Sequence, residues 1–184
     1  QEPQGDVTDA STFDTEQLGF MCGIEVHQQL ATGKLHSRQP SELFDVTIDS
    51  VPEDWPRYAR RLRLASGEGG KVDVAARFEK RRNRSFVYIQ SPNSGLIELD
   101  ESPPLSHDSD ALDVALTVSA MLGAKPVGAV QTMRKTVVDG SNTSGFQRTS
   151  LISTDGTLKT DIGDVGIDVL CLEEDSARKL DTIP

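Results

Sequence analysis

Apolar and polar side chains alternate along several short stretches of this sequence, and a period of two predicts β-strands. The first stretch, residues 22–30, places β-branched side chains on one face and acidic, imidazole and amide side chains on the other. A tight hairpin is expected over residues 150–159, where Asp155 and Gly156 fit a type I′ turn. Further strands are predicted at residues 34–37, at 86–90 with 95–99 as its hairpin partner, within 127–138, and at 165–172.

Helical periodicity is clearest over residues 109–122, where apolar positions recur at intervals of three and four. Ser106 or Asp108 is placed to cap this helix, and Gly123 is placed to end it. A shorter helix is expected over residues 74–82. The apolar stripe of the longer helix consists of Leu112, Ala115, Leu116 and Ser119.

Strands in pairs with single helices between them predict an α+β fold, built as a mostly antiparallel sheet with flanking helices. The 184 residues suffice for one good core and are too few for two ordinary domains with a linker. Residues 1–16 are polar and lack any period, so we expect a disordered lead-in followed by one domain over residues 17–184. No apolar run approaches the roughly 18 residues that a membrane span needs, and no membrane partner is expected.

The charge balance is strongly acidic, with 29 acidic and 19 basic residues and a net charge of −10. Such a surface fits adaptation to high salt, where carboxylates hold water, and it equally fits an ordinary acidic protein. A nucleic-acid partner would have to bind the basic runs at residues 57–63 and 80–84. The alternative interpretation of these two runs is a solvated face. Two cysteines, Cys22 and Cys171, are too few for a disulfide framework, which favours a reducing cytoplasm.

Glu25 and His27 form the first group of side chains that can carry chemistry. They are two residues apart, so on a strand both project from one face, about 6.6 Å apart. An acid and an imidazole held on a rigid sheet provide two ligands for a divalent cation. The alternative is a half-buried strand with a solvated polar face.

A second group surrounds the segment 141–149, which is rich in hydroxyls, amides and glycine and follows two adjacent cations. In such a segment backbone N–H groups can approach phosphate oxygens, although the spacing of a Walker loop is absent. A polar turn between two strands is the alternative. The candidate nucleotide- and substrate-binding residues are Arg134, Lys135, Ser141, Asn142, Ser144, Gly145 and Gln147.

The third group consists of Glu173, Glu174 and Asp175, which follow the last predicted strand. A run of acids is commonly a solvated strand end. Placed on the same sheet as Glu25 and His27, it completes the oxygen-rich surroundings that Mg²⁺ prefers. Carboxylates and a metal beside cations and a backbone cradle are what transfer of a γ-phosphoryl group requires, so the residues predict a nucleotide-dependent phosphoryl transferase.

Several of these stretches together resemble one protein family. Residues 23–30 resemble the opening motif of the B/E subunits of tRNA-dependent amidotransferases, and residues 134–149 resemble its archaeal E-subunit branch in particular. Residues 99–104 and 172–175 fall where that branch has similar stretches. The resemblance runs from residue 18 to residue 184, with the motifs in the same order.

The resemblance implies a cytoplasmic, ATP-dependent enzyme whose cradle-shaped domain is related in fold to glutamine synthetase. In that family ATP phosphorylates the γ-carboxylate of the glutamate on misacylated Glu-tRNA(Gln). Ammonia from a partner, the asparaginase-like D subunit, then displaces phosphate to give Gln-tRNA(Gln). Carried over by position, the catalytic residues are Glu25, His27 and one or both of Glu173 and Glu174, with Glu25, His27 and Glu173 as Mg²⁺ ligands and residues 144–147 lining the pocket.

The sequence departs from the family in two ways. Where the family often has thiolates, this chain has Ser37, Gln39 and Gly95, so no structural zinc is expected. Family members also continue well past residue 184, so we expect this chain to be the N-terminal part of the cradle. The alternative function is a non-catalytic tRNA-binding or scaffold fragment of the same fold.

Overall fold

The computed structural model describes residues 14, 18–19, 21–61, 70–72, 74–137, 140, 146–174 and 177–182. The elements in this part of the chain are β1 (Arg57–Arg61), α1 (Val74–Arg81), β2 (Ser85–Ile89), α2 (Ser109–Met121), β3 (Lys125–Pro126), β4 (Thr132–Thr136), β5 (Phe146–Thr160) and β6 (Gly163–Glu173). Their strand pairs are antiparallel, which confirms the predicted α+β class. Apart from Asp14, the predicted lead-in at residues 1–16 lies outside the described residues.

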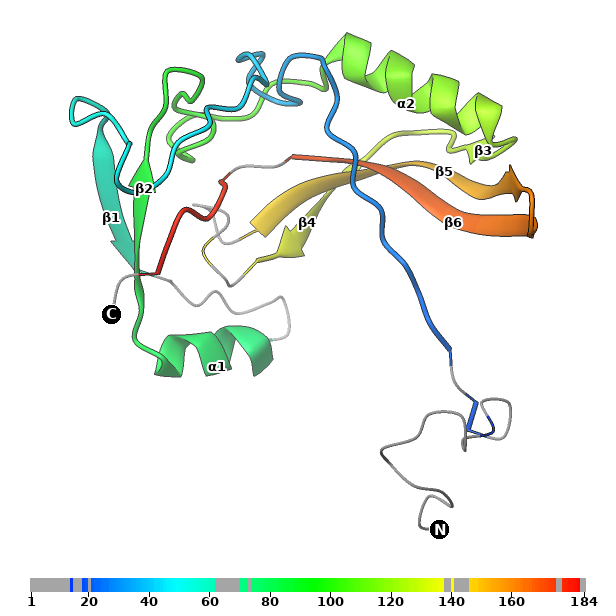
Figure 1. Ribbon diagram of the computed structural model, residues 1–184, viewed down its shortest axis with the longest axis horizontal. Helices are drawn as coiled ribbons and strands as arrows, with labels where there is room; N and C mark the ends of the chain where they lie inside the picture. The colour runs from blue at the N-terminus through cyan, green and yellow to red at the C-terminus, as the bar shows by residue number, and fades with distance from the viewer. Residues whose placement is uncertain are drawn as a thin grey trace.

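The main sheet is organised around a long ribbon made of β5 and β6. Strands β4 and β3 pair with successive parts of β5, and β6 pairs with β5 from Thr149 opposite Glu173 to Thr160 opposite Gly163. Helix α2 lies along one face of this sheet, and β1 and β2 form a separate two-stranded sheet (Figure 1). The core lies between α2 and the ribbon and contains Leu35, Ala111, Ala115, Ile152 and Leu172.

Helix α2 begins as predicted, because the Asp108 side chain accepts a hydrogen bond of 3.1 Å from the Ala111 N–H. It ends as predicted before Gly123, whose φ of +60° suits glycine. The predicted apolar stripe is only partly correct, since Ala111, Ala115 and Ser119 are buried whereas Leu116 is exposed. Small side chains on the buried face let the sheet approach closely, with Ser119 Oγ 2.7 Å from Ser153 Oγ. Neither described helix has the length and apolar character that crossing a membrane requires.

The hairpin predicted at residues 150–159 is wrong, because β5 continues through Asp155 and Gly156 and the chain turns only at residues 161–162. Gly156 serves a different purpose there. A Cβ at this position would lie 3.2 Å from Ala124 Cβ and 3.3 Å from Leu122 Cβ. The Thr157 N–H also donates to the Leu122 carbonyl at 2.8 Å. The Asp-Gly pair therefore marks a close approach of the chain leaving α2 and not a turn.

Three other strand predictions are also wrong. Residues 35–37 form a turn, held by the bridge between Gly33 and Pro40, and residues 96–100 form turns as well. The partner of β2 is β1, with Arg57 opposite Ile89, and not residues 95–99. Residues 21–30 are extended but pair with no strand in the described part of the chain. Strand formation needs a partner as well as a pattern, and the pattern alone cannot supply one.

The remaining predictions match the structure closely. Helix α1 and strand β2 coincide with the predicted residues 74–82 and 86–90 to within one residue at each end. Strand β6 includes all of residues 165–172, and the predicted β stretch at 127–138 contains β4. These elements have strong local periodicity, which is why the sequence predicted them correctly.

Candidate functional site

Glu173, the last residue of β6, contacts polar side chains from two other strands, β5 and β4. Thr149 Oγ1 donates to Glu173 Oε1 at 3.2 Å, and Gln147 Nε2 donates to Glu173 Oε2 at 3.1 Å. Lys135 Nζ lies 3.6 Å from Glu173 Oε1. The register explains this convergence, because Thr149 pairs with Glu173 and Lys135 pairs with Gln147. Alternation along the strands then places all four side chains on one face.

The extended segment 21–30 brings His27 to the same carboxylate. His27 Nδ1 lies 3.6 Å from Glu173 Oε2, and His27 Nε2 lies 3.8 Å from Glu25 Oε2. Both contacts become ion pairs only when His27 is protonated. The structure thus brings Glu25, His27 and Glu173 together, as the sequence pattern suggested, although the strand on which that prediction relied is absent from the described residues.

The carboxylate oxygens of Glu25 and Glu173 are donors that suit Mg²⁺, whereas an imidazole suits softer divalent ions better. The Glu25 and His27 side chains are 80% and 69% exposed, and Glu173 is 20% exposed. Within the described residues, no group of three or more His, Cys, Asp and Glu side chains is arranged to hold a metal ion. The oxygen donors fit the cation chemically, and the assignment of the three residues as ligands stays a prediction.

Glu174 has different surroundings from its neighbour. Its carboxylate is buried and accepts a hydrogen bond of 2.7 Å from Arg148 Nη1, and its N–H donates to the Arg148 carbonyl at 3.0 Å. Arg148 Nη2 also lies 3.8 Å from Asp100 Oδ1. Sequence reasoning did not decide between Glu173 and Glu174 as the catalytic acid. In the structure Glu173 lies beside His27, whereas Glu174 forms a buried ion pair with Arg148.

Arg134 and Lys135 do not act as one pair of cations. Lys135 points toward Glu173, whereas the Arg134 guanidinium lies 5.5 Å from the centre of the Phe146 ring, beside Arg148. Adjacent residues of a strand face opposite sides of the sheet, which separates them. The predicted ligand-binding residues Ser141, Asn142, Ser144 and Gly145 lie outside the described residues.

Residues 20–183 match the model of the GatB/GatE catalytic domain, and this match includes every strand and helix described above. The chain belongs to the GatB/GatE catalytic-domain family. The resemblance inferred from the motifs at residues 23–30 and 134–149 is therefore confirmed.

Individual relatives are E subunits of glutamyl-tRNA(Gln) amidotransferases. The chain is 46% identical over 168 residues to the E subunit of Pyrococcus furiosus, a match that covers 91% of this chain and 26% of that protein. It is 46% identical over 170 residues to the E subunit of Methanopyrus kandleri, covering 91% of this chain and 26% of that protein. It is 43% identical over 161 residues to the E subunit of Thermoplasma acidophilum, a match that covers 88% of this chain and 26% of that protein. The chain thus spans about a quarter of the length of these curated relatives.

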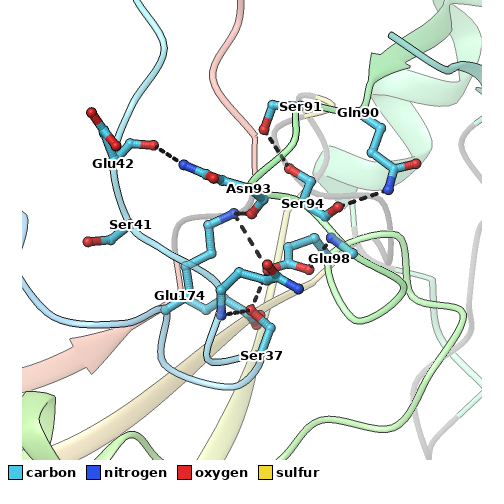
Figure 2. Close-up of polar contacts among 12 residues, drawn as sticks. Ser37, Ser41, Glu42, Gln90, Ser91, Asn93, Ser94, Glu98 and Glu174 are labelled. Atoms are coloured by element: carbon cyan, nitrogen blue, oxygen red, sulfur yellow. Dashed lines mark hydrogen bonds and ion pairs between the residues drawn. The ribbon is translucent and has the colours of Figure 1, made fainter.

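This GatB/GatE catalytic domain brings Ser37, Gln39 and Gly95 together, although Gly95 is far from the other two in sequence. Ser37 Oγ donates to Glu98 Oε1 (Figure 2). The Gly95 N–H donates to Glu98 Oε2 at 2.8 Å. A Cβ at Gly95 would lie 3.3 Å from Gln39 Nε2. Lys34 Nζ lies 3.5 Å from Glu98 Oε1 and donates to the Asn93 carbonyl at 2.6 Å. Hydrogen bonds and an ion pair thus cross-link the 33–40 turn to the loop at 91–99.

Glu98 is the centre of this cross-link and is only 7% exposed. Burial raises the pKa of its carboxyl, but hydrogen bonds from Ser37 and from backbone N–H groups, together with the Lys34 charge, outweigh burial and lower the pKa below its ordinary value. The carboxylate is therefore the form that the fold stabilises. Sequence reasoning missed Glu98 and included Thr149 only as part of the segment 141–149, because only tertiary contacts and strand register place the two side chains beside their partners.

A histidine pair joins the same turn to the main sheet. His107 Nε2 lies 2.7 Å from Ser150 Oγ on β5, and His36 Nδ1–H donates to the Leu105 carbonyl at 2.9 Å. The two imidazole centres are 5.1 Å apart. Burial lowers the pKa of His107, and the charges of His36 and Arg38 lower it further. The fold thus favours the neutral form of the His107 ring, which links the segment before α2 to β5.

Proposed function

We propose that this domain carries out the ATP-dependent conversion of Glu-tRNA(Gln) to Gln-tRNA(Gln) as part of a longer cytoplasmic protein. The observation that carries the proposal is the convergence of Lys135, Gln147, Thr149 and His27 on the Glu173 carboxylate. Family membership supports the proposal, because the relatives are named as E subunits of glutamyl-tRNA(Gln) amidotransferase.

In the proposed reaction an oxygen of the glutamyl γ-carboxylate attacks the γ-phosphorus of ATP, and the bond from that phosphorus to the β-phosphate oxygen breaks to release ADP. The nitrogen of ammonia then attacks the acyl carbon, phosphate leaves, and a proton from nitrogen passes to solvent. We propose that the ammonia comes from an asparaginase-like D subunit. Bound Mg²⁺ would supply charge neutralisation at the phosphate oxygens.

The residues of this chain have distinct roles in the proposal. Glu173 and Glu25 would hold the cation through their oxygens, with His27 beside them. Thr149 and Gln147 each donate to a different oxygen of Glu173, so they fix the orientation of that carboxylate before a ligand binds. Lys135 places a positive charge on the same face, where it can offset charge that develops on a transferring phosphoryl group.

The direct test replaces Glu173 by Gln in the full-length protein together with its partner subunit. Because the substitution removes the charge and keeps the shape, we expect ATP-dependent amidation to fall by on the order of 100-fold or more. Affinity for tRNA, measured by filter binding, should change by less than about twofold. Glu25→Gln should behave similarly.

Asp164→Asn is the matched control, since Asp164 is an exposed acid on the same strand and opposite Lys159, away from the Glu173 group. It should leave amidation within about twofold of the wild-type rate. Full activity of Glu173→Gln would overturn the assignment of this site. Loss of tRNA binding, with amidation reduced equally in Glu173→Gln and Asp164→Asn, would instead favour the scaffold function. In that function the basic side chains of β1 and α1 contact tRNA.

A further inference from the structure

Two imidazoles, those of His36 and His107, lie side by side where the 33–40 turn meets the segment before α2. Their ring centres are 5.1 Å apart. His36 is only 3% exposed, and its Nδ1–H donates to the Leu105 carbonyl. Its other ring nitrogen, Nε2, is buried and has no hydrogen-bond partner among the described residues. A second proton on this ring would therefore lie on a nitrogen that is shielded from solvent and has no acceptor beside it, which costs free energy.

The second imidazole, that of His107, is held by hydroxyl groups of the main sheet. His107 Nε2 lies 2.7 Å from Ser150 Oγ on β5 and 3.4 Å from Thr132 Oγ1 on β4. Ser150 is fully buried, and its hydroxyl oxygen lies 3.2 Å from that of Thr132. The pair of imidazoles thus joins the 33–40 turn to two strands of the sheet.

The charged groups around the pair do not compensate a positive charge on either ring. The Arg38 guanidinium donates to the His107 carbonyl at 2.9 Å, so it adds a cation to the same place. The Asp108 carboxylate also lies there, but Arg38 Nε at 3.7 Å and the Ala111 N–H already engage it. The side chains that contact the pair from β4 and β5 are uncharged hydroxyls. Burial and the charges of His36 and Arg38 accordingly lower the pKa of His107.

We propose that the histidine pair is a pH-sensitive junction, in which protonation of either ring separates the 33–40 turn from the segment before α2. In the closed junction the Leu105 N–H donates to the His36 carbonyl and the Asp108 N–H donates to the Leu35 carbonyl, both at 2.9 Å. Opening would break these hydrogen bonds and expose the rings, so that the added proton is solvated. Residues 31–33 connect the turn to the segment that carries His27, so opening would also release one end of that segment.

The pH range follows from the direction of the shift at His107. A histidine whose pKa is lowered on folding adds stability above its unfolded pKa of about 6.5, and this stability is lost as the pH falls from that value toward the folded one. The pKa of Glu98 lies below 4.5, so that carboxylate stays ionised over this range. The junction should therefore open as the pH falls from about 7.5 to about 5.5. It is independent of the proposed reaction, and no activity measurement is needed to test it.

The test is hydrogen–deuterium exchange of the full-length protein at about pH 7.5 and about pH 5.5, measured by mass spectrometry and corrected for the intrinsic exchange rate at each pH. Protection of amides in residues 33–40 and 105–112 should fall by at least about tenfold between the two conditions. His107→Gln, which keeps a hydrogen-bonding side chain opposite Ser150, should reduce this fall to less than about threefold, and the double variant His36→Gln/His107→Gln should abolish it. His27→Gln is the matched control, because the His27 side chain is 69% exposed and its replacement should leave the pH dependence unchanged.

Three outcomes would overturn the proposal. Equal protection of residues 33–40 and 105–112 at the two pH values would show that the junction does not respond to acid. A fall of the same size in residues 158–166, at the far end of the β5–β6 ribbon, would show that the effect is global. An unchanged pH dependence in the double variant, or its loss in His27→Gln, would assign the titration to another group. The wild-type measurement decides the matter even where a variant fails to fold.

Discussion

At Glu98 several groups converge on one buried carboxylate, and the fold depends on its charge. The Ser37 hydroxyl, the Gly95 N–H and the Lys34 ammonium all favour the ionised form, which is why the pKa is lowered. A group whose pKa is lowered in the folded state adds stability above its unfolded pKa of about 4.5, and that stability is lost as the pH falls through the folded value. The cross-link between the two loops should therefore weaken under acid conditions.

Glu98→Gln should lower the stability of the full-length protein by about 1–3 kcal/mol at pH 7, because Gln removes the charge that three donors stabilise. The measurement is the midpoint of thermal unfolding between pH 3 and pH 7. The midpoint temperature of the wild-type protein should decrease as the pH is lowered below 4.5, and the variant should lose part of this pH dependence. Glu101→Gln is the control, since Glu101 forms an exposed ion pair with Arg60 and should change stability by less than about 1 kcal/mol. A Glu98→Gln variant as stable as that control would contradict this account.

At the scale of elements, the β5–β6 ribbon depends on how closely the chain leaving α2 approaches it. Gly156 permits that approach, because a Cβ there would lie 3.2–3.4 Å from the Cβ atoms of Leu122, Ala124 and Ile167. Gly156→Ala should therefore destabilise the protein by about 1–3 kcal/mol through overpacking. Gly166→Ala should be neutral or slightly stabilising, because its added Cβ would meet nothing within 4 Å. Both variants can be compared by thermal unfolding, and equal midpoints would mean that packing at Gly156 is not restrictive.

At the scale of the whole molecule, the net charge of −10 governs how the protein responds to salt. Repulsion among 29 acidic residues should loosen so thin a core in dilute buffer. The Debye length shrinks from about 10 Å at 0.1 M to about 3 Å at 1 M, so molar salt removes most of that repulsion. We therefore expect the midpoint of thermal unfolding of the full-length protein to rise between about 0.1 M and 1 M KCl. A midpoint that is flat or falling over that range would contradict adaptation to high salt.

The sequence by itself determined the elements whose periodicity is local and strong. Helix α2 with its cap at Asp108, helix α1, strand β2 and strand β6 all follow from patterns within a single segment. Family membership also followed from contiguous motifs, and the grouping of Glu25, His27 and Glu173 was anticipated from them. Patterns of this kind are fixed by neighbouring residues, so no knowledge of distant parts of the chain is needed.

Only the tertiary structure decided what depends on distant partners. It left residues 21–30 unpaired within the described chain, paired β2 with β1, and carried β5 straight through Asp155 and Gly156. It also gave the side chains of Glu173 and Glu174 different partners. It placed Thr149 beside Glu173, and Glu98 beside the Gly95 N–H. Strand partners, register and close approach depend on which segments meet in space, and a one-residue change in register moves every side chain to the opposite face.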